Sequence, residues 1–282
     1  MTTDTTPGTT PRTSPSGVPG QATRVADPSL GPDRGPSLGR LVRSEWTKLR
    51  SLRSTWWALL LAALIGLGLA AAVAAGVDAG DPSIDALGED HVALVLGATG
   101  TAALVLGVLG ALQMSSEYTS GTISVSVIAV PKRRPLLAAK AALLVAVVAP
   151  LSLAVSAGAL LIGDAMIEGG LTFSWPAVLG NTAYLTAVAV LGLSLATLTR
   201  STAMAIAVLV AVVFVLPPLL PALPWGWLET LADFLPSAAQ ESLISTVSGT
   251  APLGDAAAVR TLAIWILAPL TAGAVLLTRR DA

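Results

Sequence analysis

The residues of this chain that could do chemistry are few, and none falls into a catalytic or metal-binding pattern. The 282 residues include no cysteine and one histidine, His91. This excludes disulfides, thiolate metal sites and histidine clusters. Gly163-Asp164 matches half of an intramembrane aspartyl protease motif, but position 161 is Leu and no apolar run carries a partner Asp. The sequence also lacks the zinc-protease, serine-hydrolase and phosphate-loop motifs. We therefore expect no enzyme activity, no metal and no directly bound cofactor.

A polar segment between two long apolar runs is the most distinctive feature of the sequence. It extends from Glu117 to Lys140 in a chain that is 54% hydrophobic and 12% charged. Such a segment is typical of a surface that another protein binds. Within it, residues 122–130 fit an amphipathic helix and also an alternating strand, so periodicity leaves both structures open.

Apolar runs long enough to cross a hydrocarbon layer of about 30 Å make up most of the remaining sequence. They predict an all-α polytopic membrane protein with six transmembrane helices. We place the spans at about 56–77, 92–114, 141–163, 177–199, 202–223 and 257–278. The fourth and fifth must be joined by a tight turn at Arg200 and Ser201. Pro217 and Pro218 should kink or unwind the end of the fifth, because proline lacks an amide donor.

The charged residues between the spans predict the orientation. Lys and Arg are found before span one, between spans two and three, between spans four and five, and after span six, whereas the opposite loops carry only Asp and Glu. By the positive-inside rule, both termini are cytoplasmic. We expect a plasma membrane protein. Residues 1–37 are rich in Thr, Pro, Gly and Ser and should form a disordered cytosolic tail, leaving 38–282 as the membrane domain.

The middles of the six spans contain no ionisable residue, which disfavours a proton-coupled carrier. Hydroxyl and amide side chains are present. Most such groups in membrane helices bond a neighbouring helix or their own backbone. Asn181 and Tyr184 are the best candidates for a substrate path.

Residues 38–56 predict an amphipathic basic helix ahead of the first span. Leu and Trp recur at spacings of three and four, with Lys and Arg at most other positions. Such a helix lies in the membrane interface and contacts anionic lipid. A simple anchor for span one would explain the pattern equally well.

Two motifs resemble the permease subunits of the ABC-2 class of ATP-binding-cassette transporters. The first is Ser44-Glu45-Trp46-Thr47-Lys48-Leu49-Arg50-Ser51; the second is Glu117-Tyr118 with Gly121-Thr122-Ile123, followed by Pro131, Arg133-Arg134 and Lys140. The resemblance covers about residues 40 to 280. In that class the loop between spans two and three forms a cytosolic coupling helix that contacts a separate ATPase subunit.

The resemblance implies a site at each motif. The residues of the ATPase-coupling interface would be Glu117, Tyr118, Gly121, Thr122, Ile123, Arg133 and Arg134. Those of the interfacial helix would be Glu45, Trp46, Lys48 and Arg50. The segment 224–256 resembles the short re-entrant helices that precede the last span of such permeases.

The implied function is that of a permease subunit that exports an amphiphilic, lipidic, peptide or drug-like substrate. ATP would be hydrolysed by a partner ABC ATPase subunit, and a second permease copy or paralogue would complete the transporter. We expect contact with membrane lipid and none with nucleic acid. The alternative is a membrane scaffold or sensor that recruits a cytosolic partner and transports nothing.

Overall fold

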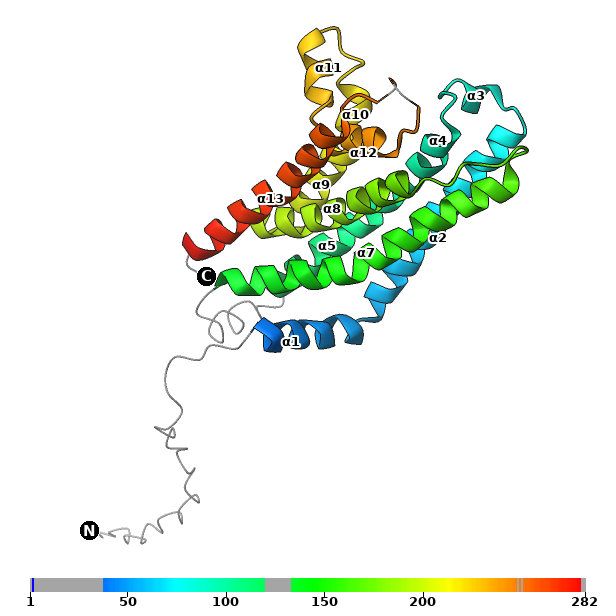
Figure 1. Ribbon diagram of the computed structural model, residues 1–282. Helices are drawn as coiled ribbons and strands as arrows, with labels where there is room; N and C mark the ends of the chain where they lie inside the picture. Colours follow the sequence, from blue (N-terminus) through cyan, green and yellow to red (C-terminus); the bar gives the residue numbers. More distant parts are fainter. Residues whose placement is uncertain (1, 3–37, 120–132, 248, 250, 280–282) are drawn as a thin grey trace. The chain divides into compact units, whose positions relative to one another are not determined.

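The computed structural model describes residues 2, 38–119, 133–247, 249 and 251–279. The chain divides into two units, Met1–Arg34 and Gly35–Ala282, and every described helix belongs to the second. The predicted tail and the segment 120–132 lie outside the described residues. The described elements are all helices (Figure 1), which confirms the predicted all-α class.

Six helical stretches of the described chain are long and apolar enough to span a membrane, as predicted. Their helices are α2 (Arg53–Asp78); α4 (His91–Ala98), η1 (Thr99–Thr101) and α5 (Ala102–Thr119); α7 (Arg133–Met166); α8 (Trp175–Thr199); α9 (Thr202–Val210), η2 (Ala211–Val215) and α10 (Leu216–Leu219); and α13 (Asp255–Arg279). The third span differs most from the prediction, because its helix begins at Arg133 rather than near 141. Lys140, predicted to lie outside the span as a charged residue, is buried within the helix.

Among the described residues, four shorter helices lie toward the ends of the bundle (Figure 1): α1 (Leu38–Ser51), α3 (Pro82–Asp85), α11 (Gly226–Ala232) and α12 (Pro236–Ile244). We name the two ends of the bundle after α1 and α3. The helices α11 and α12 fall in the segment predicted to hold short re-entrant helices. They lie at the α3 end.

The fourth span, α8, is the centre of the bundle. Its apolar window is 72% buried, against 17% for the fifth and the sixth span. It packs against α5, α7, α12 and α13. Glycines allow the closest approach, since a Cβ on Gly110 of α5 would collide with the carbonyl of Ala189, and one on Gly192 of α8 with the carbonyl of Gly107. The two backbones therefore touch directly, as small residues permit in membrane helices.

The turn between the fourth and fifth spans is as tight as the sequence predicted. Arg200 ends α8 in a left-handed conformation with φ of 52°, and Ser201 caps α9 by accepting the amide of Met204 at 3.4 Å. Further on, η2 is π-helical just ahead of Pro217. Because proline supplies no amide proton, the regular bonding ladder cannot pass through it. The irregular end predicted for the fifth span is present.

The second span contains a break that the sequence analysis did not predict. We expected one helix over 92–114, but the structure has a 3₁₀ turn, η1, between α4 and α5. The hydroxyl of Thr99 donates to the carbonyl of Leu96 at 2.6 Å, and the carboxamide of Gln240 lies 3.0 Å from the position that a Cβ on Gly100 would take. A polar side chain from α12 thus reaches the helix at the turn.

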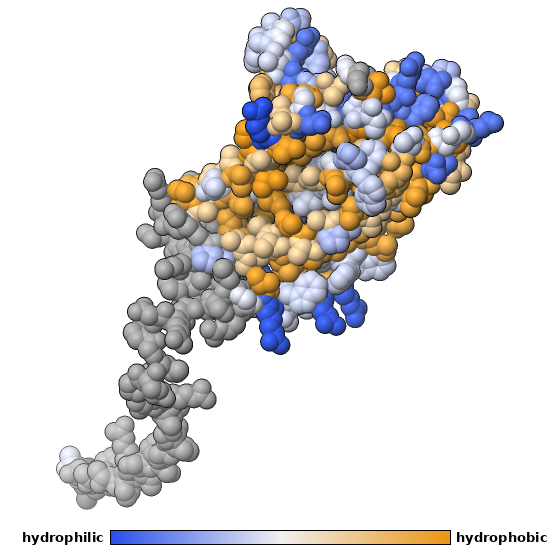
Figure 2. All heavy atoms as spheres, viewed as in Figure 1, coloured by the Kyte–Doolittle hydropathy of each residue, from blue (hydrophilic) through white to orange (hydrophobic). Residues whose placement is uncertain are grey.

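The surface carries the pattern of a membrane protein. On the face shown in Figure 2, apolar residues form a broad band, and hydrophilic residues gather at its two ends. Large apolar side chains exposed on the spans include Leu64 of α2, Met204 of α9 and Ile264 of α13. An exposed apolar band between polar ends fits a bilayer, which confirms the membrane class.

Candidate functional site

The helix α1 is amphipathic, but its inward face is not purely apolar. Val42, Glu45 and Leu49 follow a helical spacing and form the face that packs mainly against α7. Glu45 is only 3% exposed, whereas Trp46, Lys48 and Arg50 lie on the exposed side. Of the four residues predicted for the interfacial helix, three are therefore accessible to a partner and Glu45 is turned into the protein.

Glu45 forms a buried ion pair with Lys140 of α7. The Nζ of Lys140 lies 2.6 Å from a carboxylate oxygen of Glu45, and the two side chains are 2% and 3% exposed. The other carboxylate oxygen accepts from Lys48 at 2.7 Å. Burial alone would raise the pKa of Glu45, but the charge of Lys140 and hydrogen bonds from both lysines outweigh it and hold the pKa below its usual value. The carboxylate is thus ionised at neutral pH.

The predicted coupling segment is only partly described. Glu117 and Tyr118 lie on the last turn of α5, and Arg133 and Arg134 begin α7. Both helix ends lie at the α1 end of the bundle (Figure 1), although the side chains of these four residues are not described. Gly121, Thr122 and Ile123 lie outside the described residues, so the choice between helix and strand at 122–130 stays a prediction.

Asn181 is the centre of a buried polar network. Its side-chain amide donates to Thr99 Oγ1 at 2.7 Å and to Ser156 Oγ at 2.9 Å, and its oxygen accepts from Gln240 Nε2 at 2.9 Å. These four side chains come from η1, α7, α8 and α12. Asn181 is fully buried. The network ties α12 to three of the spans.

Tyr184 lies one helical turn beyond Asn181 and is also buried. It belongs to the main apolar core, where it is 2% exposed. Neither Asn181 nor Tyr184 lines the cavity at the α3 end. A role for either residue in a substrate path stays a prediction.

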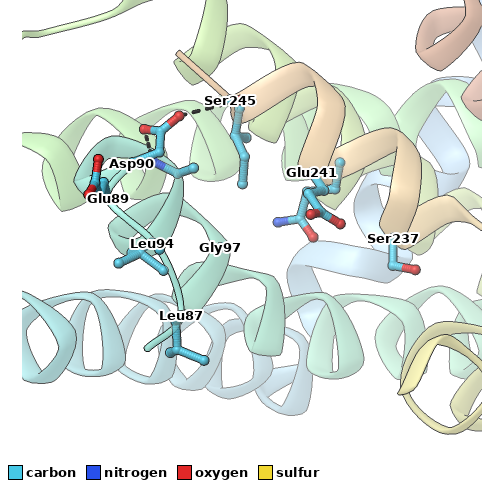
Figure 3. Close-up of a pocket in the computed structure, with 12 residues that line it drawn as sticks. Leu87, Glu89, Asp90, Leu94, Gly97, Ser237, Glu241 and Ser245 are labelled. Carbon is cyan, nitrogen blue, oxygen red and sulfur yellow. Dashed lines mark hydrogen bonds between the residues drawn. The ribbon is translucent and has the colours of Figure 1, made fainter. Parts of the chain in front are cut away.

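A cavity of about 470 Å³ lies at the α3 end, between α4 and α12. Figure 3 shows Leu94 and Gly97 on one side of it and Ser237 and Glu241 on the other. Burial and the nearby charge of Asp233 raise the pKa of Glu241. The part of the chain that the structure describes holds no group of three or more His, Cys, Asp or Glu placed to bind a metal.

Asp90, at the rim of this cavity, clamps the segment that follows α12. It caps α4 by accepting the amide of Ala93 at 3.0 Å, and it accepts the amides of Thr246 at 2.6 Å and Val247 at 3.1 Å. The hydroxyls of Ser245 and Thr246 also donate to it (Figure 3 draws the bond from Ser245). Partial burial would raise the pKa of Asp90, but these bonds outweigh it and lower the pKa. An Asp ahead of a predicted helix is the one local signal of this clamp.

Replacing Asp90 by Asn should loosen the clamp, because an amide group would face backbone donors. We expect a loss of about 1 kcal/mol in stability, since hydrogen bonds to charged groups contribute that much or more. The measurement is the thermal unfolding midpoint in mild detergent, with the exposed Asp85→Asn as control. Because folding lowers the pKa of Asp90 from 3.8, the clamp contributes its full stability above that pH. This contribution is lost only as the pH falls through the lower pKa of the folded state. An equal midpoint for the two variants at neutral pH would contradict the assignment.

One comparison with known proteins gives a match. A family profile described as ABC-2 family transporter protein matches residues 41–222, well over half of the chain. The match begins within α1 and ends after α10, so it includes both motifs and five of the six spans. No curated protein sequence matches the chain.

Proposed function

The chain belongs to the ABC-2 family of transporters, and from this premise we propose that it is the permease subunit of an exporter driven by a separate ATPase. The family match over residues 41–222 is the observation that carries the proposal. The six apolar helices supply the membrane-crossing part. The proposal adds that a separate ATPase supplies the energy, that transport is directed out of the cell, and that the substrate is amphiphilic, lipidic, peptide or drug-like.

The charges at the two ends of the bundle support the orientation. Lys48, Arg50 and Arg53 lie at the α1 end, whereas Asp81 and Asp85 lie at the α3 end. Positive residues concentrate on the cytoplasmic side of membrane proteins. The α1 end is then cytoplasmic, and both termini lie on that side of a bacterial plasma membrane.

This orientation gives the ATPase a place to bind. Trp46, Lys48 and Arg50 are exposed on α1, and the segment 117–134 joins α5 to α7 at the same end. A partner that binds these surfaces differently in its ATP-bound and ATP-free states would shift the permease between two arrangements. A partner with equal affinity for both states would shift nothing.

The substrate class follows from the spans. Their middles carry no ionisable side chain, so an amphiphilic, lipidic, peptide or drug-like molecule suits them better than a small ion. A second permease copy or paralogue would cover the exposed apolar faces of this one. Together with two ATPase subunits, the pair would form the transporter.

Copurification with an ABC ATPase subunit from the same organism tests the proposal. Glu117→Ala and Gly121→Leu should each lower the amount of retained ATPase by about tenfold, as central interface residues do. ATP-driven movement of a fluorescent phospholipid in reconstituted vesicles should fall with it. Asp85→Asn, at the opposite end, serves as the control.

The outcomes separate the exporter from a scaffold. If the wild-type chain retains the ATPase but ATP drives no movement of lipidic, peptide or cationic amphiphiles, the chain is a scaffold. If both variants retain the ATPase and its turnover is unchanged, segment 117–134 is not the coupling interface. If a reporter fused after Ala282 is located on the extracellular side of the membrane, the proposed orientation is wrong.

A further inference from the structure

The ion pair between Glu45 and Lys140 connects the helix before the first span to the third span. We propose that this pair is a positioning device that fastens α1 to α7, so that a movement imposed on α1 passes directly to the third span. The inference about attachment stands on the structure alone. Its consequence for transport rests on the proposed function.

The burial of both charges is the first support. Lys140 is the largest fully buried side chain among the described residues, and Glu45 is the single acidic residue of α1. Taking two charges out of water is costly, and apolar residues of similar size often stabilise a fold at least as well. A buried pair is thus better suited to fixing one arrangement of two helices than to adding stability.

The connection of α1 to the two neighbouring spans is the second support. Leu52 separates α1 from α2 with an extended backbone, φ −87° and ψ 105°, so the two helices do not form one rigid rod. In contrast, α1 packs mainly against α7, where Val42 contacts the buried Ala139 next to the ion pair. The chain thus joins α1 to the first span through a bend at Leu52, while side chains fasten α1 to the third span.

The position of Lys140 is the third support. It lies within the first two turns of α7, the helix that begins directly after the segment 120–132. A partner bound to the exposed side of α1 and to this segment would therefore act on the same end of the same span. Glu45 faces inward and so acts through Lys140 rather than by touching the partner.

The attachment can be measured by disulfide cross-linking, because the chain has no cysteine of its own. In a chain carrying Val42→Cys and Ala139→Cys, adding Glu45→Gln should slow cross-linking by about tenfold, since Lys140 loses the ion pair that fastens it to α1. Adding the exchange Glu45→Lys with Lys140→Glu, together with Lys48→Gln so that no like charge faces position 45, should restore the rate. Thr47→Ala, on the exposed side of α1, is the control and should change nothing.

Cross-linking at the unchanged rate in the Glu45→Gln protein would overturn the proposal. If the Glu45→Gln protein does not accumulate, the protein with the exchanged charges provides the test of the attachment. An exchanged protein that accumulates and cross-links at the original rate supports the attachment, and one that accumulates without cross-linking, or does not accumulate, overturns it. No ATPase is needed in this experiment, so its result does not depend on the proposed function.

The predicted effect on transport is measured with the permease reconstituted together with its ATPase. Glu45→Gln should keep ATP turnover per complex within about twofold but lower transported substrate per ATP by about tenfold, and the exchanged pair should restore the ratio. A purely structural pair would lower the amount of folded complex and leave that ratio unchanged. If the wild-type complex shows no transport, the proposed function fails while the cross-linking result still stands.

Discussion

Replacement of Gly110 or Gly192 by alanine is expected to prevent most of the chain from reaching its folded state. In each case the new methyl group would collide with a carbonyl of the facing helix, Ala189 for Gly110 and Gly107 for Gly192. A clash with backbone cannot be relieved by a side-chain rotation, so α5 and α8 must separate. Overpacking costs about 1–3 kcal/mol and more where nothing yields. We expect a loss of at least about 3 kcal/mol here.

The measurement is the amount of monodisperse protein that survives heating in mild detergent. Gly68→Ala is the matched control, because no atom lies within 4 Å of a Cβ there. Alanine also favours helix over glycine by about 1 kcal/mol. The control should therefore be at least as stable as the original chain. Equal survival of Gly110→Ala and Gly68→Ala would show that α5 and α8 do not pack backbone to backbone.

Asn181→Ala is expected to have the second-largest effect. Asn181 makes three side-chain hydrogen bonds to three other segments, and its loss leaves Gln240 and Thr99 with fewer partners. Hydrogen bonds between membrane helices average about 0.6 kcal/mol each, so we expect a loss of about 2 kcal/mol. The heat-survival measurement used for the glycine variants also reports this loss.

A double-mutant cycle distinguishes the network from a substrate contact. If Asn181 and Gln240 act together, the double alanine variant should be less destabilised than the sum of the single variants. Thr186→Ala is the control, since that hydroxyl bonds only its own helix at Thr182. Unchanged stability combined with altered transport in Asn181→Ala would instead assign Asn181 to the substrate path.

The features that depend on local sequence were predictable. The six spans follow from runs of apolar residues, and the turn at Arg200 and Ser201 follows from the length that one helix can have in a bilayer. The π-helical turn of the fifth span appears where Pro217 and Pro218 remove amide donors. In each case the cause lies within a few residues of the effect.

The features that depend on distant pairs were not predictable. Glu45 and Lys140 are 95 positions apart, and each taken alone looked like a residue of the membrane surface. The polar network at the turn likewise includes Gln240, which comes from α12. One signal was available for the ion pair, namely a single acidic residue in an otherwise basic helix.

The candidate site was predictable only as a region. The described residues of both motifs lie at the α1 end, and residues 41–222 carry the family match. Gly121, Thr122 and Ile123 lie outside the described residues. The contacts proposed for them are with a partner subunit, and neither periodicity nor the fold of one chain can supply such contacts. They stay predictions for the copurification experiment.

The enclosure of α8 has a consequence for the order in which the protein is made. α8 is the fourth span, yet α12 and α13, which complete its surroundings, are synthesised after it. Until α12 is made, the oxygen of Asn181 has no bond from Gln240. The surroundings of α8 are thus complete only after α13 is made, and a nascent chain that stalls after α10 would leave its most buried span partly uncovered.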